Sequence, residues 1–458
     1  MSSRPLLLWA PQAWIDGRWQ ASVLLRTDDH GQWTEIAPGV APPPQAVRLT
    51  GAALPGLVDA HSHAFQRAFV GLAERRDSDH DDFWSWRDRM YGVALQLTPE
   101  MMRSIAAHLY GELLSGGYTQ VCEFHYLQHA EDGSPYGDPA AMSHALADAA
   151  TAAGIGLTLL PVLYERAGFG QAQLRPDQRR FATSVADVLA LQKAARGPLV
   201  NAGVAVHSLR AAHPESIRAL AEGSAGPLHI HVAEQTSEVD DCLSATGCRP
   251  IEWLSRHAAL DSRWQLVHAT HSTPAEVDAV ARTGAGVVLC PATEANLGDG
   301  LCDLSGWLAT GVPMAVGSDS QVVRAWPEEL RWLEYGQRLA LRRRNVSALP
   351  AQEPATAARL FERMLAGGGR AAGFERWGLQ VGARADLLEV NVDDPALCGL
   401  PPSHLLDGVV FAAAARPFAR VMVAGGWCDL PAAGGAGSAA MRAAMQILWG
   451  GAARGGRA

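Results

Sequence analysis

The sequence is poor in lysine. Of its 38 basic residues, Lys193 is the only lysine, and all the others are arginine. Basic residues are also outnumbered, because 47 acidic residues give the chain a formal net charge of -9. No basic run stands out, which argues against a nucleic-acid surface. An anionic ligand would therefore have to be bound by a few locally placed arginines.

Cysteines are few and irregularly spaced. There are seven, without a CxxC pair, at positions 122, 242, 248, 290, 302, 398 and 428. This argues against a thiolate zinc site and predicts a reduced, cytoplasmic protein. No apolar stretch reaches the roughly 18 residues of a membrane span. The apolar run in MSSRPLLLWAPQAW is too short for a signal peptide.

The two ends of the chain share a β-rich pattern. With 458 residues, of which 48% are hydrophobic, the chain is long enough for more than one domain. Short strand patterns fill residues 1–55 and return near residue 380 in GLQVGARADLLEVNV, VVFAAA and ARVMVAGGW. They predict a composite β-sandwich domain made of residues 1–55 and 375–430. Residues 431–458 are predicted to be a linker-like tail in which AMRAAMQILW can form a terminal helix.

Between these ends, eight apolar strand patterns alternate with stretches of helical spacing. They lie at residues 55–63, 118–126, 156–165, 202–210, 227–234, 265–271, 286–294 and 313–319. Eight strand–helix repeats are typical of a (β/α)8 TIM barrel. The predicted fold is therefore α/β, with a barrel over residues 56–374 and a small composite β-sandwich domain.

Most of the strand patterns end in ionisable side chains. In VDAHSHAF, His61 and His63 point the same way because side chains alternate along a strand. His231 ends the fifth pattern, His268 the sixth and Asp319 the eighth. These strand ends form the active-site face of a TIM barrel, and nitrogen and oxygen donors suit zinc or iron. A lone HxH could be a surface pair, but the further donors favour a metal site.

These motifs resemble those of the amidohydrolase superfamily, and the resemblance covers nearly the whole chain. The shared pattern is HxH after the first strand, His-x-x-Glu after the fifth, His after the sixth and Asp after the eighth. The resemblance implies four metal ligands: His61, His63, His231 and Asp319. Two-metal members also carry a carboxylated lysine on the fourth strand, whereas Lys193 precedes that strand. The resemblance is therefore to the mononuclear-metal deaminase branch.

The resemblance also implies catalytic roles. A bound divalent cation lowers the pKa of water from 15.7 to about 7. Asp319 would take a proton from this water, and Glu234, three residues past His231, would pass a proton to the leaving nitrogen. His268 would hydrogen-bond the attacking water or the developing tetrahedral centre. Alternatively, Glu234 could have a purely structural role as a capping residue at the start of a helix.

Two longer motifs are more specific. They are AFQRAFVGLAERR with DDFWSWRDRMYG, in residues 64–92, and CPATEANLGDG, in residues 290–300. Both resemble the formimidoylglutamate deiminase family, which converts N-formimino-L-glutamate and water to N-formyl-L-glutamate and ammonia in histidine degradation. This resemblance implies one zinc (or iron) per chain and a homodimer. It also implies substrate binding by Gln66, Arg87, Tyr126, His207 and Arg210.

The residues themselves agree with a dicarboxylate substrate. Arginine binds carboxylates in bidentate fashion, and an acidic protein needs such groups inside its pocket. Arg210 follows the fourth strand and Arg87 lies in the long segment after the first. Either could instead be an exposed surface arginine, Arg87 on an amphipathic helix FWSWRDRM.

Three alternatives stay open at this point. A deaminase of guanine, another heterocycle or a guanidino compound would use the same metal site, although a flat base does not need two arginines. A two-metal amide or hydantoin hydrolase is disfavoured by the absent lysine. A catalytically inactive metal-binding barrel would keep the ligands without hydrolysing a substrate.

Overall fold

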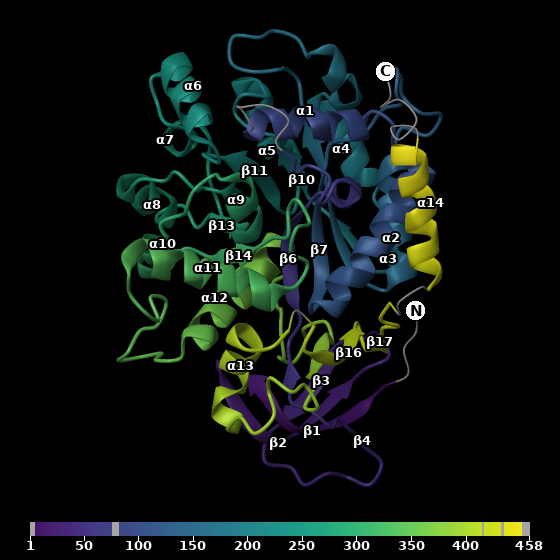
Figure 1. Ribbon diagram of the computed structural model, residues 1–458, viewed down its shortest axis with the longest axis vertical. Coiled ribbons are helices and arrows are strands. Elements are labelled where there is room, and N and C mark those ends of the chain that lie inside the picture. Colours follow the sequence, from purple (N-terminus) through teal and green to yellow (C-terminus); the bar gives the residue numbers. More distant parts are fainter. Residues whose placement is uncertain (1–4, 76–81, 415, 432–434, 451–458) are drawn as a thin grey trace.

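The computed structural model describes residues 5–75, 82–414, 416–431 and 435–450. One of its two sheets is built from both ends of the chain, as the violet and yellow strands of Figure 1 show. Its strand order is β17-β16-β15-β5-β1-β2-β3, with β4 paired to β1. The strands are β1 Leu7–Ile15, β2 Arg18–Thr27, β3 Trp33–Ala37, β4 Val47–Arg48, β5 Ala53–Leu54, β15 Leu387–Val390, β16 Phe418–Val423 and β17 Gly426–Trp427.

The second sheet is the predicted TIM barrel, which is confirmed. Its neighbouring strands are parallel, and every predicted strand pattern overlaps one of them. The strands are β6 Leu57–Ser62, β7 Tyr118–His125, β8 Gly156–Leu163, β10 Val204–Val206, β11 Leu228–Val232, β12 Trp264–His268, β13 Gly286–Leu289 and β14 Met314–Val316, while β9 Val200–Ala202 also pairs with β8. A parallel bridge between Ser62 and Asp319 joins the first strand to the segment after the last.

Helices surround the barrel, and local sequence fixes many of their ends. Thr98, Ser184 and Thr273 cap helix N-termini with their side chains, whereas Gly154 and Gly247 end helices in the left-handed conformation. The helices are α1 Phe83–Ala94, α2 Pro99–Ser115, α3 Ala141–Ala153, α4 Val185–Ala194, α5 Pro214–Gly223, α6 Thr236–Thr246, α7 Pro250–His257, α8 Pro274–Ala281, α9 Pro291–Leu297, α10 Leu304–Thr310, α11 Trp326–Leu341, α12 Thr356–Ala371, α13 Leu405–Phe411 and α14 Ala436–Gly450. Short 3-10 turns are η1 Ala64–Ala68, η2 Pro176–Phe181 and η3 Pro402–His404.

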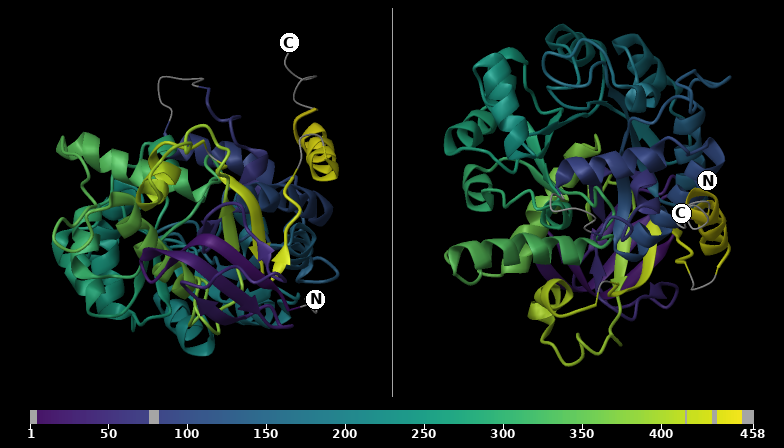
Figure 2. Two further views of the ribbon diagram at one scale, coloured as in Figure 1. Left: turned by 90° about the horizontal axis from the view of Figure 1, so that it is seen from below. Right: turned by 45° about the horizontal axis from the view of Figure 1, so that its top comes forward.

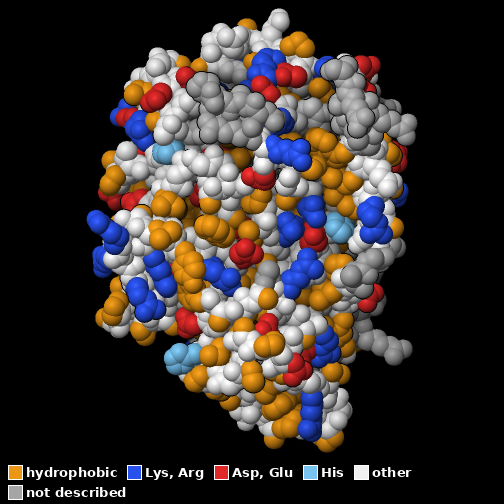
Figure 3. Space-filling view, viewed as in Figure 1, with side chains coloured by type: hydrophobic (Ala, Val, Ile, Leu, Met, Phe, Trp, Pro, Cys, Tyr) orange, Lys and Arg blue, Asp and Glu red, His pale blue; other side chains and the backbone are white. Residues whose placement is uncertain are grey.

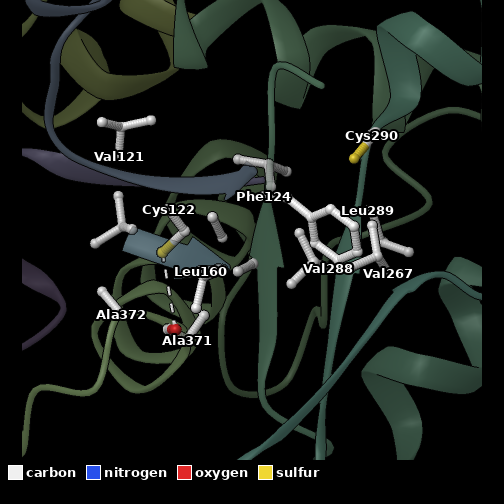
Figure 4. Close-up of a cluster of buried hydrophobic side chains, with 14 of the residues drawn as sticks. Val121, Cys122, Phe124, Leu160, Val267, Val288, Leu289, Cys290, Ala371 and Ala372 are labelled. Carbon is white, nitrogen blue, oxygen red and sulfur yellow. Dashed lines mark hydrogen bonds between the residues drawn. The ribbon is translucent and has the colours of Figure 1, made fainter. Parts of the chain in front are cut away.

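The barrel strands are covered on both faces. All residues of β6, β7, β8 and β11 are buried, as continuous apolar strand patterns predict. Figure 4 shows side chains from several strands packed together with the end of α12, including Phe124, Leu160 and Val288. This core holds the strand ends rigid, and a site built on them is fixed in geometry.

One strand pattern is wrong. VVFAAA, at residues 409–414, was grouped with the β-rich ends, but α13 covers Leu405–Phe411. A short apolar run does not distinguish a buried helix from a buried strand, because its periodicity is too brief. Leu406, Val409 and Val410 are buried and follow helical spacing.

The last helix, α14, packs against helix α2 on the outside of the barrel. Figures 1 and 2 show α14 along α2 on the outside of the molecule. Trp449 Nε1 donates a hydrogen bond of 3.1 Å to Ala68 O, and its ring stacks on Phe69. Helix α14 therefore supports η1, which follows the first barrel strand. Within the described residues, no helix combines the length and apolar character needed to cross a bilayer.

Candidate metal centre and active-site pocket

The four predicted metal ligands meet where β6, β11 and β14 end. His61 Nε2 lies 2.9 Å from His231 Nε2 and 3.5 Å from Asp319 Oδ1. His63 Nε2 lies 3.4 Å from the same carboxylate oxygen. All four side chains are buried. His61 Nε2 thus lies beside both the His231 imidazole and the Asp319 carboxylate, which His63 Nε2 also approaches, at the barrel mouth.

The protonation of these groups fits a cation. His63 Nδ1 donates a 2.8 Å hydrogen bond to Phe124 O, which leaves its Nε2 lone pair facing Asp319. Burial lowers the pKa of His61 to about 4 and of His63 to about 3, and it lowers the pKa of His231 well below its ordinary range. Burial works to raise the pKa of Asp319, but its hydrogen bond with His61 and the nearby imidazoles outweigh this and lower it. Neutral imidazoles and a carboxylate are the donors that zinc prefers.

The backbone at these strand ends is unusual. His268 has φ 70°, Asp319 φ 46° and Ala233 φ 53°, all in the left-handed region that residues with a Cβ rarely adopt. Such conformations cost on the order of 1–3 kcal/mol each and cluster at functional sites. Here they accompany a close approach of rings, since the His268 ring centroid lies 5.9 Å from that of His61.

His268 lies among three carboxyl groups. Its Nε2 is 3.7 Å from Glu234 Oε1 and 3.9 Å from Asp319 Oδ2, and its Nδ1 is 3.5 Å from Glu294 Oε1. Burial opposes its charged form, but these carboxylates outweigh burial and raise the pKa of His268 to about 10. Burial raises the pKa of Glu234 to about 7. A carboxyl group that titrates near neutrality beside an imidazolium can transfer protons.

One pocket brings the predicted site residues together. Its lining includes all five predicted substrate-binding residues, three of the four metal ligands and both other predicted catalytic residues. The lining residues are His63, Gln66, Phe83, Trp86, Arg87, Met90, Tyr91, Tyr126, His207, Arg210, His231, Glu234, His268, Leu297 and Asp319. Within the described residues, Gln66 Oε1 and Arg87 Nε are buried without a hydrogen-bond partner. The pocket therefore presents polar groups that a ligand can satisfy.

Two arginines that line this pocket have their guanidinium groups over the same indole ring, that of Trp84. Cζ of Arg87 lies 4.4 Å, and Cζ of Arg210 6.0 Å, from the ring centroid of Trp84. The face of the indole stabilises both cations. Among the described residues, Arg87 has one carboxylate nearby, Asp88 Oδ1 at 3.6 Å, and Arg210 has none within ion-pair distance. Both remain available to bind carboxylates of a ligand.

Comparison with known proteins decides the family. The model of a family described as "Amidohydrolase family" matches residues 52–428, which include the whole barrel and every pocket residue. The chain belongs to the amidohydrolase family.

Individual relatives indicate which members of the amidohydrolase family this chain resembles in sequence and structure. It is 46% identical over 447 residues to the formimidoylglutamate deiminase of Pseudomonas aeruginosa, covering 96% of this chain and 98% of the relative. The crystal structure of an amidohydrolase from Brucella melitensis superposes with a TM-score of 0.91 and 39% identity, over 97% of this chain and 99% of that one. A zinc-bound adenosine deaminase from Xanthomonas campestris shares the fold, with a TM-score of 0.78 and 23% identity over 97% and 98% of the two chains. The first relative places this amidohydrolase with the formimidoylglutamate deiminases.

The amidohydrolase pocket also contains residues that were not singled out from the sequence. Phe83, Trp86, Met90 and Tyr91 lie on α1, and Leu297 lies on α9. The residues of α1 recur at intervals of three and four positions, so that they share the face that carries Arg87. This periodicity was a usable signal. Glu294 ends the seventh strand pattern, residues 286–294, and nothing in the sequence pairs it with His268.

A hydrogen-bond network behind the ligands steadies the first strand of the amidohydrolase barrel. Ser62, between the two ligand histidines, donates to Glu123 Oε2 at 2.9 Å, and Ala64 N donates to Glu123 Oε1 at 2.6 Å. Gln321 Nε2 donates to Ser62 Oγ at 3.0 Å and to Asp319 O at 2.9 Å. Gln321 therefore ties the segment after β14 to the end of β6, and the buried carboxyl group of Glu123 ties that end to β7.

This network predicts a pH dependence of stability. Burial raises the pKa of Glu123 from 4.5 to about 8. Its contribution to stability is therefore fully present below about pH 4 and is lost as the pH rises towards 8. We expect the free energy of unfolding to fall by on the order of a few kcal/mol between about pH 5 and about pH 8, and to fall less in Glu123→Gln. Urea unfolding of both proteins across this range measures it, and parallel pH curves would contradict it.

Proposed function

We propose that this chain hydrolyses N-formimino-L-glutamate to N-formyl-L-glutamate and ammonia, a reaction of histidine degradation. The observation that carries the proposal is the joint presence, in one pocket, of a metal-binding group and two arginines over a common indole. The substrate has one electrophilic formimino carbon and two carboxylates. The metal-binding group suits the formimino carbon, and the two arginines suit the carboxylates. The similarity to a formimidoylglutamate deiminase over nearly the whole chain supports the same substrate.

The polar wall of the pocket is proposed to hold the glutamate part of the substrate. Arg87 and Arg210 bind its carboxylates, and Gln66 and Tyr126 add uncharged hydrogen bonds. Burial first, and then the nearby Arg210, lower the pKa of His207 well below its ordinary range. A neutral His207 can donate a hydrogen bond without adding a further charge to the two guanidinium groups.

One zinc per chain is proposed at the metal-binding group, held by His61, His63, His231 and Asp319. When bound, a divalent cation makes hydroxide available at neutral pH by lowering the pKa of water from 15.7 to about 7. Iron uses the same donors and is an outcome that metal analysis distinguishes.

The remaining groups are proposed to move protons. Asp319 Oδ2 accepts a proton from the attacking water. Glu234, whose pKa of about 7 allows it to gain and lose a proton near neutrality, protonates the imino nitrogen and regains a proton from the hydroxyl group of the tetrahedral centre. The proton held by Asp319 is the second one that the nitrogen takes up as it leaves as ammonia. His268 donates a hydrogen bond from Nε2 towards the tetrahedral centre, and Glu294 on its other nitrogen fixes the orientation of the ring.

The proposal is tested by measuring ammonia release from N-formimino-L-glutamate, with metal content determined on the same sample. We expect turnover with about one zinc per chain. Turnover of guanine or another heterocycle, with none on formiminoglutamate, would overturn the substrate. Bound metal without hydrolysis of either class of compound would favour an inactive barrel.

Substrate binding is tested by Arg210→Met. Removing one partner of a buried charge pair costs about 2–5 kcal/mol, so we expect KM to rise roughly 30- to 4000-fold while the metal is retained. Arg218→Met, an exposed arginine on α5, is the matched control and should leave KM unchanged. An unchanged kcat/KM in Arg210→Met would remove this residue from the pocket.

A cytoplasmic location and a homodimer are also proposed. All seven cysteines are free and five of them are buried, which suits a reducing compartment. Exposed apolar side chains on helix α11 support the homodimer.

A further inference from the structure

Exposed hydrophobic side chains concentrate on one helix. Of the twelve large ones among the described residues, four belong to α11, which has only 16 residues: Trp332, Tyr335, Leu339 and Leu341. Leu339 is 78% exposed. A fifth, Leu301, lies over the middle of the helix, where its Cδ2 is 2.7 Å from the place that a Cβ on Gly336 would occupy. Contiguous exposed apolar patches mark interaction sites.

Helix α11 is apolar on two faces. Leu330 and Leu333 are buried on the face that packs against the barrel. Trp332, Tyr335 and Leu339 follow one another at intervals of three and four residues on the other face, and form what we call the α11 stripe. Figure 3 shows hydrophobic side chains gathered over this part of the surface, beside basic ones.

The α11 stripe has opposite charges at its two ends. Glu328 lies in the first turn of the helix, four residues before Trp332. Arg342, Arg343 and Arg344 follow the last turn, and all three are exposed. Where the structure describes the chain, neither Glu328 nor Arg343 takes part in an ion pair. Along the chain, an acidic residue therefore precedes the apolar α11 stripe, and a basic run follows it.

We propose that a second copy of this chain covers the α11 stripe, with the two α11 helices antiparallel across a two-fold axis between Tyr335 and Gly336. Trp332 and Leu339 lie at equal distances along the helix from this axis. Trp332 would thus meet the partner's Leu339, and the converse holds on the other side. A two-fold interface requires such self-complementarity.

The charges support the same arrangement. In an antiparallel pair, the helix start that carries Glu328 lies near the partner's helix end, which the basic run of Arg342, Arg343 and Arg344 follows. A parallel arrangement would instead place the arginine run against its own copy, and like charges across an interface are strongly unfavourable. Helix α11 has 16 residues and is therefore about 24 Å long. This inference deepens the proposed homodimer and does not depend on the substrate.

The first test measures the mass of the full-length protein by sedimentation and light scattering over a range of concentrations. We expect the wild type to be a dimer and Leu339→Glu to weaken dimerisation at least about 100-fold, because it buries an unpaired charge in an apolar contact. Ile447→Glu is the control, since Ile447 is 68% exposed on α14, and should stay dimeric. A monomeric wild type, or an unaffected Leu339→Glu dimer, would overturn the proposal.

The second test addresses the antiparallel register with charge swaps at low ionic strength, where screening is weak. Glu328→Arg and Arg343→Glu should each weaken the dimer several-fold, because each places like charges together. The double variant should restore it, since the ion pairs form again with exchanged signs. Single swaps without effect, or a double variant weaker than both, would overturn the register. These measurements need no substrate, so they stand apart from the outcome for the proposed reaction.

Discussion

We expect His231→Ala to lose its bound metal and to reduce turnover by roughly 10⁴-fold or more. The substitution deletes one of four donors from a buried group, in which His231 Nε2 lies 2.9 Å from His61 Nε2. Without the cation, water keeps a pKa near 15.7, and hydroxide is scarce at neutral pH. Metal content by atomic spectroscopy and ammonia release on the same protein measure both effects.

The same strand provides a control. His229 also lies on β11 and is buried, but its Nε2 is 2.9 Å from Ala371 O and takes no part in the metal-binding group. His229→Gln keeps a hydrogen-bonding side chain and should retain the metal. Full metal occupancy with normal activity in His231→Ala would remove His231 from the ligand set.

Glu234→Gln is expected to separate metal binding from proton transfer. The variant should keep its metal, because Glu234 is not one of the four donors, and should lose about 10²–10⁴-fold in kcat. The amide resembles the carboxyl in shape but does not carry the proton to the leaving nitrogen. Steady-state kinetics and metal analysis together measure the separation.

Glu165→Gln is the matched control for this variant. Glu165 also follows a barrel strand, but it accepts hydrogen bonds from His213 N and Ser216 Oγ and does not line the pocket. Its turnover should stay near that of the wild type. A near-normal rate in Glu234→Gln would mean that another group delivers the proton, and Asp319 or His268 would then be examined.

The barrel could be predicted from the sequence because its pattern is long and repeated. Eight apolar runs with helical stretches between them leave few architectures other than a (β/α)8 barrel. The segment VVFAAA shows the limit of the same reasoning, since six apolar residues satisfy a helix or a strand equally well. Its first three residues are helical in α13, and this conformation depends on packing, which no local pattern contains.

The site was predictable where it depends on strand ends. The HxH pattern, His231 and Asp319 each end a barrel strand, so topology alone brings them together. Trp84, by contrast, lies in the segment after β6, and its contact with Arg210 depends on how α1 folds over the mouth. His268 has a left-handed backbone, which is uncommon for residues with a Cβ, and no pattern in the sequence reveals it or pairs His268 with Glu294.

The bridge between Ser62 and Asp319 has a consequence for the order in which the protein matures. Ribosomes make β6 early and β14 late, yet both strands must be present before the fourth donor reaches the three imidazoles. A partly synthesised chain can therefore offer only histidines, and a cation at the proposed site would meet all four donors only after the barrel has closed. Truncation before β14 would abolish barrel closure and metal retention in one step.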